Sequence, residues 1–178
     1  MKPHFELTLP VSPADHAIGP AHAQVTIVEY GDFECPNCRQ GAPVVQLLVK
    51  QFGDRLRFVY RHFPLEEVHP HALNAAEAAE AAAGQGKFWP MHHLLYEHQH
   101  ALKANNLRSY ARELELDMAR FDYEMKDTVY LQRVREHQKG GTDSGVRATP
   151  TFFLDGKIAD VSFGAKSLFD AVERALAK

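Results

Sequence analysis

The sequence predicts an α/β protein in which a helical segment interrupts one sheet-containing domain. Three observations lead to this fold class. The N-terminal third has the pattern strand, helix, strand. Residues 66–139 carry apolar residues at helical spacing, and the chain after residue 150 returns to strand, strand and helix. One α/β domain with an all-helical insertion accounts for the three segments most simply.

The N-terminal part begins with an irregular arm, because its first 24 residues are rich in proline and glycine. We expect one short edge strand in this arm, over 5–9. The β-branched run 25–30 predicts a buried strand, the apolar pattern 36–52 predicts a helix, and the alternating run 56–60 predicts a second strand. A strand–helix–strand order implies a parallel pair with a right-handed crossover.

The middle part predicts four or five helices and no strand. The alanine-rich run 72–83 predicts the first helix, which Gly84 and Gly86 close. Asp117 is a suitable N-cap for a later helix. The apolar positions that indicate the remaining helices are Phe88, Met91, Leu95 and Leu102; Leu107, Tyr110, Ala111 and Leu114; Met118, Phe121 and Met125; and the run 130–139, which ends before Gly140 and Gly141.

The C-terminal part predicts a hairpin and a final helix. Residues 151–154 have strand texture, and the pair Asp155-Gly156 is a two-residue hairpin signal. The partner strand is expected over 157–163. Ser167 is expected to cap a last helix over 168–177.

Composition limits the function classes. The chain has 178 residues, of which 45% are apolar and 24% charged, and its formal net charge is −3. These values are typical of a globular domain and do not favour a nucleic-acid partner. No run approaches the roughly 18 apolar residues of a membrane span, and the N-terminus lacks the pattern of a signal peptide. We expect a cytoplasmic protein if the chain is complete, and a periplasmic or extracytoplasmic one if a leader was removed.

The two cysteines of the chain, Cys35 and Cys38, are three positions apart between the predicted strand and the predicted helix. A thiol at a helix N-terminus is stabilised as the thiolate by free N–H groups and by the helix dipole. A zinc site would need further Cys or His partners at suitable spacing, and haem attachment would need histidine where Arg39 stands. A redox pair is therefore the favoured interpretation.

Several motifs together resemble the thioredoxin superfamily, and the helical insertion resembles its DsbA-type branch. The motifs are Glu29 six positions before Cys35, the run Cys35-Pro36-Asn37-Cys38, and the run Ala148-Thr149-Pro150-Thr151-Phe152. Further runs are similar to DsbA-like proteins and to thioredoxin-like domains fused to sodium/proton antiporters: Asp15-His16 with Gly19, Asp32-Phe33-Glu34, His69-Pro70-His71-Ala72 and Lys87-Phe88-Trp89. The resemblance implies a thioredoxin-like domain over 1–64 and 146–178 and an inserted helical domain over 65–145.

The resemblance also implies roles for individual residues. Cys35 would be the exposed nucleophile, and Cys38 the buried thiol that resolves a mixed disulfide. Pro36 and Asn37 would tune the pair. Strongly oxidising relatives carry histidine at the position of Asn37, so we expect a reduction potential between about −270 and −120 mV.

Three more residues complete the expected site. Pro150 resembles the cis-proline of the superfamily, and Thr149 before it would pair with an extended substrate. Glu29 would exchange a proton with Cys38, with a pKa raised by burial. For Pro150 an ordinary trans turn stays open, and for Glu29 a strand-end carboxylate turned to water stays open.

The leading functional expectation is a thiol–disulfide oxidoreductase, DsbA-like, acting on protein or peptide thiols. Its redox partner would be a protein or glutathione. We expect a monomer without cofactor. No metal site is expected, because the adjacent His92 and His93 point about 100° apart on a helix and the other histidines fit surface or capping positions. The alternative is a redox-sensing or partner-binding module without its own turnover.

Overall fold

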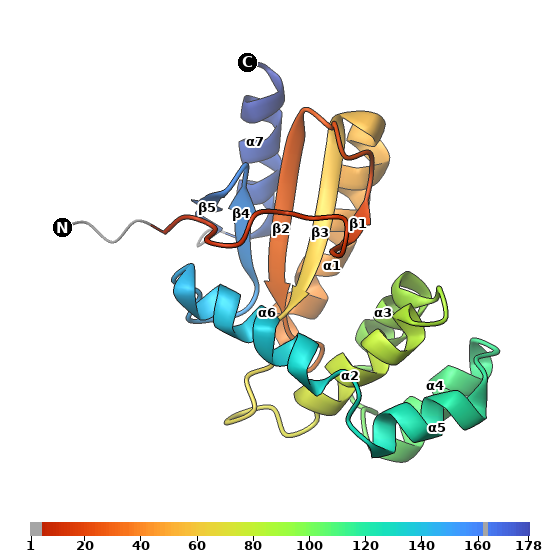
Figure 1. Ribbon diagram of the computed structural model, residues 1–178. Coiled ribbons are helices and arrows are strands. Elements are labelled where there is room, and N and C mark those ends of the chain that lie inside the picture. Colours follow the sequence, from red (N-terminus) through yellow and green to blue (C-terminus); the bar gives the residue numbers. More distant parts are fainter. Residues whose placement is uncertain (1–4, 162–163) are drawn as a thin grey trace.

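A mixed five-stranded sheet forms the centre of the computed structural model, which describes residues 5–161 and 164–178 (Figure 1). The strand order is β1-β3-β2-β4-β5. β2 and β3 are parallel, as predicted from the strand–helix–strand order, and the other neighbours are antiparallel. The strand bounds are β1 His16–Ile18, β2 Val25–Gly31, β3 Leu56–His62, β4 Thr151–Leu154 and β5 Lys157–Ala159.

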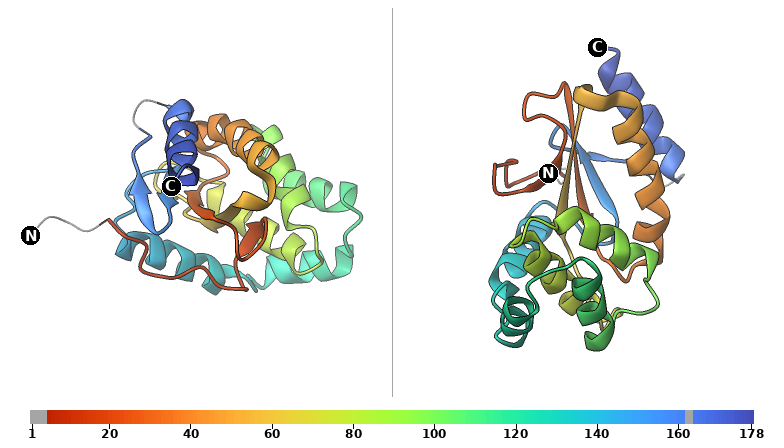
Figure 2. Two further views of the ribbon diagram at one scale, coloured as in Figure 1. Left: turned by 90° about the horizontal axis from the view of Figure 1, so that it is seen from above. Right: turned by 90° about the vertical axis from the view of Figure 1, so that its right-hand side faces the viewer.

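Helices α1 (Pro36–Phe52) and α7 (Ala165–Leu176) lie together on one face of this sheet (Figure 2). Pro36 stands in the first turn of α1, where its missing N–H leaves no hydrogen bond unmade. Gly53 ends the helix with a positive φ of 51°, and a short 3₁₀ turn, Gly53–Arg55, leads into β3. The crossover therefore brings β3 back beside β2 in parallel.

Both faces of the central strands are buried, which explains the nearly continuous apolar run of β2 and the burial of most residues of β3. Ile27 and Phe58 belong to the larger core beneath α1 and α7, whereas Val28 and Val59 belong to a smaller core on the opposite face. The N-terminal arm crosses that second face (Figure 1). The buried guanidinium of Arg61 holds the arm there.

Five helices form the inserted segment between β3 and β4. They lie at the end of the sheet toward which β2 and β3 run (Figure 1). Their bounds are α2 Ala72–Ala83, α3 Phe88–Glu97, α4 Ala104–Glu113, α5 Met118–Lys126 and α6 Leu131–Asp143. The predicted all-helical middle is thus confirmed. The domain boundaries at 64/65 and 145/146 stay predictions. Among the described helices, none is long and apolar enough to cross a membrane.

The predicted edge strand over 5–9 is wrong. The pairing is limited to one antiparallel bridge between Glu6 and Lys157, in which the N–H of Leu7 donates to the Gly156 carbonyl and the N–H of Ile158 donates to the Phe5 carbonyl. The N–H of Thr8 already binds the Ser144 hydroxyl. The N-terminal edge strand is β1, which pairs antiparallel with β3. Its three residues are too few to give a period-2 signal in the sequence.

Several predicted boundaries also need correction. The strand expected over 157–163 ends at Ala159, and Phe163 lies outside the described residues. The last helix begins at Ala165 after Gly164, whose φ is 92°, so Ser167 lies inside the helix and does not cap it. The second insertion helix ends at Glu97, and Leu102 is buried in the following loop.

The last insertion helix, α6, continues through Gly140 and Gly141, which we expected to end it. Both glycines are needed for close packing. A Cβ on Gly140 would lie 2.6 Å from the Leu9 side chain, and one on Gly141 would lie 2.7 Å from the Phe63 ring. These glycines therefore allow α6 to approach the arm and the residue after β3.

Candidate active site

The two cysteines lie where the chain leaves β2 and enters α1. Cys35 is the N-cap residue of α1 in extended conformation, and Pro36 follows it in the first turn. Cys38 is fully buried, as predicted. Cys35 is only 5% exposed, so the expectation of an exposed nucleophile is wrong in degree. The loop before β4 covers its sulfur.

That covering loop contains Thr149 and Pro150, joined by a cis peptide bond, as the sequence predicted. Antiparallel pairing of β4 with β2 puts Thr151 opposite Tyr30, so the loop before β4 must lie beside the turn that follows β2. The Sγ of Cys35 donates to the carbonyl oxygen of Thr149 over 3.3 Å. The sheet register thus brings together two segments that are 114 positions apart.

The surroundings of Cys35 favour its thiolate. A hydrogen bond from the Cys38 thiol lowers the pKa of Cys35 to about 5, helped by Thr149 and by the backbone N–H groups of Cys38 and Asn37, while burial opposes the shift. The Thr149 hydroxyl is buried and has no hydrogen-bond partner among the described residues. It is therefore free to donate to the sulfur once Cys35 has lost its proton.

The pKa values of Cys38 and Glu29 are raised, whereas that of Cys35 is lowered. Burial, followed by its hydrogen bond to Cys35 and the charge of Glu29, raises the pKa of Cys38 well above its ordinary value. Glu29 is 3% exposed, and burial together with the Cys35 charge raises its pKa to about 8. The alternative of a Glu29 turned to water is excluded. The site holds one stabilised thiolate and two groups that retain protons near neutral pH.

A cavity of about 650 Å³ between α1 and α3 reaches Glu29. Its walls include Arg39, Tyr96 and Trp89. Phe88 is buried in the core, as its helical spacing predicts, and Trp89 is partly buried against that core. The cavity gives the buried carboxyl group a route for proton exchange with solvent.

A surface groove of about 350 Å³ runs beside the cysteines. Asn37 lines it together with Thr149 and Pro150, and apolar side chains such as Val44 and Phe152 complete it. Asn37 is exposed, so its amide faces this groove region and not the protein interior. The groove offers room for an extended chain next to Cys35.

Two residues that sequence reasoning did not assign to the site hold the turn around Cys35. Asp32 is buried, and its carboxylate accepts the N–H of Glu34 at 2.7 Å, the N–H of Leu65 at 2.8 Å and the ring of His69 at 2.7 Å. Gln99 reaches the same turn from the helical insertion. Asp32 stood in a motif run, whereas no local pattern marks Gln99.

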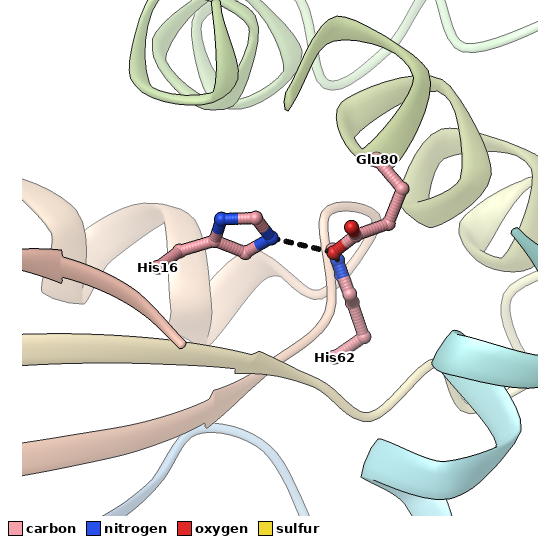
Figure 3. Close-up of side chains that lie close together, drawn as sticks. All are labelled: His16, His62 and Glu80. Atoms are coloured by element: carbon pink, nitrogen blue, oxygen red, sulfur yellow. Dashed lines mark hydrogen bonds and ion pairs between the residues drawn. The ribbon is translucent and has the colours of Figure 1, made fainter. Parts of the chain in front are cut away.

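The described residues contain one group that could hold a metal ion, made of His16, His62 and Glu80. Figure 3 shows both imidazole rings pointing at the Glu80 carboxylate. Each Nε2 lies 2.7 Å from Glu80 Oε1, and the guanidinium of Arg133 lies 2.8 Å from the other oxygen. Burial works against ionisation, but the hydrogen bonds from His16 and His62 hold the pKa of Glu80 below its usual range.

The carboxylate of Glu80 is therefore satisfied by protein groups, and an ion would have to displace ring protons beside the Arg133 cation. We interpret the group as a buried polar network that joins β1, β3 and the insertion. Among the other histidines, His137 stacks on His62 beside this network, and its Nδ1 accepts the His62 N–H at 3.1 Å. His92 is buried among aromatic rings, His93 is exposed, and His98 stacks on Tyr110. The different faces of His92 and His93 agree with the sequence prediction.

Helix α1 starts at Cys35, and the cis-proline loop lies against the Cys35 sulfur. This arrangement is that of a dithiol–disulfide active site. The fold around it is the thioredoxin fold with a DsbA-like helical insertion. A family model described as thioredoxin matches residues 11–174, and the chain belongs to this family.

Curated relatives are longer proteins. The chain is 47% identical over 174 residues to the Na(+)/H(+) antiporter NhaA 1 of Salinispora arenicola, covering 97% of this chain and 26% of that protein. It is 42% identical over 165 residues to the Na(+)/H(+) antiporter NhaA of Herminiimonas arsenicoxydans, covering 92% of this chain and 26% of the relative. The chain thus spans about a quarter of the length of these relatives.

Solved structures share the fold over nearly the whole chain. BdbD from Bacillus subtilis superposes with a TM-score of 0.82 at 20% identity, covering 92% of this chain and 94% of that one. A thioredoxin-like oxidoreductase from Silicibacter pomeroyi has a TM-score of 0.80 at 28% identity, covering 94% and 95%. The alpha-DsbA1 of Wolbachia pipientis has a TM-score of 0.76 at 19% identity, covering 97% and 95%.

Proposed function

We propose that this protein is a thiol–disulfide oxidoreductase that exchanges the Cys35/Cys38 disulfide with thiols of proteins or peptides. The observation that carries the proposal is the asymmetry of the pair. Cys35 has a pKa lowered to about 5, whereas burial keeps Cys38 protonated. One sulfur is therefore ready to attack or to leave, and the other holds a proton until it is needed.

In the oxidising direction, a substrate thiolate attacks the Cys35 sulfur of the disulfide. A substrate–Cys35 disulfide forms, the Cys35–Cys38 bond breaks, and Cys38 leaves as a thiolate that takes a proton from Glu29. A second substrate thiolate then attacks the substrate sulfur and expels the Cys35 thiolate. The substrate loses two electrons as its disulfide forms, and the cysteine pair gains them.

In the reducing direction, the Cys35 thiolate attacks a substrate disulfide, and one substrate sulfur leaves. Cys38 then gives its proton to the Glu29 carboxylate and attacks Cys35, which releases the second substrate sulfur. The charge of Cys35 is one cause of the raised Glu29 pKa. Because the mixed disulfide removes this charge, the Glu29 pKa falls at the step where Cys38 needs a base.

The groove beside the cysteines supports an extended peptide as the substrate. The Thr149 backbone lies at its edge next to Cys35, where a peptide could pair with it as a short added strand. The second redox partner would be a protein or glutathione. A cytoplasmic site of action would favour reduction, and a periplasmic site would favour oxidation, because thiols are kept reduced in the cytoplasm.

The alternative, a redox-sensing or partner-binding module, is favoured by one observation: the matched relatives are antiporters of which this chain spans about a quarter. Turnover distinguishes the two. We expect the oxidised protein to form a disulfide in a dithiol peptide, and the reduced protein to catalyse insulin reduction. Cys35→Ser should abolish both reactions, and Cys38→Ser should accumulate mixed disulfide. Turnover no faster than with Cys35→Ser would leave the sensing module as the function.

A further inference from the structure

Gln99 is a buried amide of the helical insertion that binds the backbone on both sides of Glu34. It lies in the loop between α3 and α4 and is 6% exposed. Its Nε2 donates to the carbonyl oxygen of Phe33 at 2.9 Å and to that of Cys35 at 2.8 Å. Both protons of the amide are thus committed to the turn that carries Cys35.

The two carbonyl groups occupy critical places in this turn. The Cys35 carbonyl also accepts the N–H of Arg39 at 3.2 Å, as the first hydrogen bond of α1. On the opposite side, the N–H of Cys35 donates to the Asp32 carbonyl at 3.1 Å. The backbone of Cys35 is therefore held by the turn after β2 through Asp32, by α1 through Arg39, and by the insertion through Gln99.

The same loop meets α1 a second time. The ring of His100 lies 3.4 Å from Arg39 Nη1, one turn after Cys35. Gln99 and His100 together place the α3–α4 loop against the first turn of α1. The orientation of the free N–H groups in this turn decides how well they meet a negative sulfur.

We propose that Gln99 is a positioning residue for thiol–disulfide exchange: from the insertion, it fixes the Cys35 turn so that the sulfur meets the N–H groups of the first α1 turn. Two effects act together. The amide holds the Cys35 peptide in the geometry of an N-cap, and its N–H groups offset the partial negative charge of two carbonyl oxygens in the turn that carries the thiolate. The inference rests on the proposed function, because it assigns Gln99 a role in that reaction.

Gln99→Met tests the proposal, since methionine has a similar length and no donor. We expect the Cys35 pKa, followed by the ultraviolet absorbance of the thiolate, to rise by about one unit. Below the pKa, the rate of Cys35 alkylation should fall by about tenfold. Gln99→Asn keeps an amide that is too short to hold both carbonyls, so it should give a smaller rise and covers the case in which Gln99→Met does not fold.

Gln85→Met is the matched control. Gln85 also belongs to the insertion and also binds backbone, but it lies in the α2–α3 turn and its amide pairs with the backbone of Asp117 at the start of α5. Urea unfolding should show a loss of stability in both methionine variants, whereas only Gln99→Met should shift the thiolate titration. Equal titration midpoints in the two methionine variants would overturn the role of Gln99. An ordinary Cys35 pKa and no turnover in the unmodified protein would instead refute the proposed function.

Discussion

Thr149→Val tests how the cis-proline loop stabilises the Cys35 thiolate. The Thr149 hydroxyl is buried and has no partner among the described residues while Cys35 is protonated. Valine has nearly the same shape, and the contact from the Thr149 carbonyl to Cys35 survives the change. The substitution therefore removes one donor to the thiolate with little effect on packing.

The expected magnitude follows from the strength of a hydrogen bond to a charged group, about 1.5–3 kcal/mol. At 1.36 kcal/mol per pKa unit, its loss corresponds to a rise of about one to two units. The Cys35 pKa should move from about 5 to roughly 6–7. A less stable thiolate makes the reduced form less stable, so the reduction potential should fall by about 30–60 mV.

The direction of the Cys35 pKa shift can also be checked through the pH dependence of the free energy of unfolding of the reduced protein. The Cys35 pKa in the folded protein lies below its ordinary value of 9.0. The thiolate therefore stabilises the reduced protein fully above that ordinary value, and this contribution is lost as the pH falls through about 5. In Thr149→Val the loss should occur at higher pH.

The assays are thiolate absorbance against pH and equilibration with glutathione buffers. Thr151→Val is the matched control, because Thr151 begins β4 directly after the loop and its hydroxyl donates to the Ala148 carbonyl at 2.6 Å. It should leave the Cys35 titration unchanged. A Thr149→Val midpoint that coincides with the unmodified protein would show that the hydroxyl does not reach the thiolate.

Three further predictions concern the potential, the buried acid and the arm. A Cys35 pKa of about 5 lies between the values of about 7 and 3.5 in thioredoxin and DsbA, which interpolates to a potential of roughly −185 mV; a measured value at or above about −120 mV contradicts it. Glu29→Gln should slow the resolution of mixed disulfides by Cys38 while leaving Cys35 alkylation intact. Because the Glu29 pKa is raised from 4.5 to about 8, the protein loses stability as the pH rises through this window, and Glu29→Gln should be relatively more stable above it; parallel urea curves across pH would contradict this. Arg61→Met should lower the free energy of unfolding in urea by about 3–5 kcal/mol. The substitution leaves the buried Asp15 carboxylate, which lies 2.9 Å from Arg61, without its partner. An unchanged free energy of unfolding would show that Arg61 does not hold the arm on the sheet.

The sequence by itself was sufficient for the elements with strong local signals. The β-branched run of β2, the proline at the start of α1 and the alanine-rich α2 have their structure encoded in neighbouring residues. The cysteine pair and the Thr149-Pro150 dipeptide were recognisable because their chemistry requires those residue types. The cis-proline beside Cys35 followed from the same motifs.

Weak or misleading local signals account for the errors. The edge strand β1 is a strand because β3 offers it an open edge, and nothing in its three residues indicates this. Gly140 and Gly141 resembled a helix end, yet they lie inside α6. These positions are glycine because Leu9 and Phe63 leave no room for a side chain. A glycine selected for close packing cannot be distinguished locally from one that ends a helix.

Only the tertiary structure decided which groups meet. The burial of Glu29, the shielding of Cys35, the unpartnered hydroxyl of Thr149 and the reach of Gln99 all depend on sheet register and on how the insertion lies against α1. The physical reason is that a pKa is set by burial and by donors within a few ångströms, and such neighbours come from distant parts of the chain. The sequence thus determined the chemistry of the site, and the packing determined its ionisation.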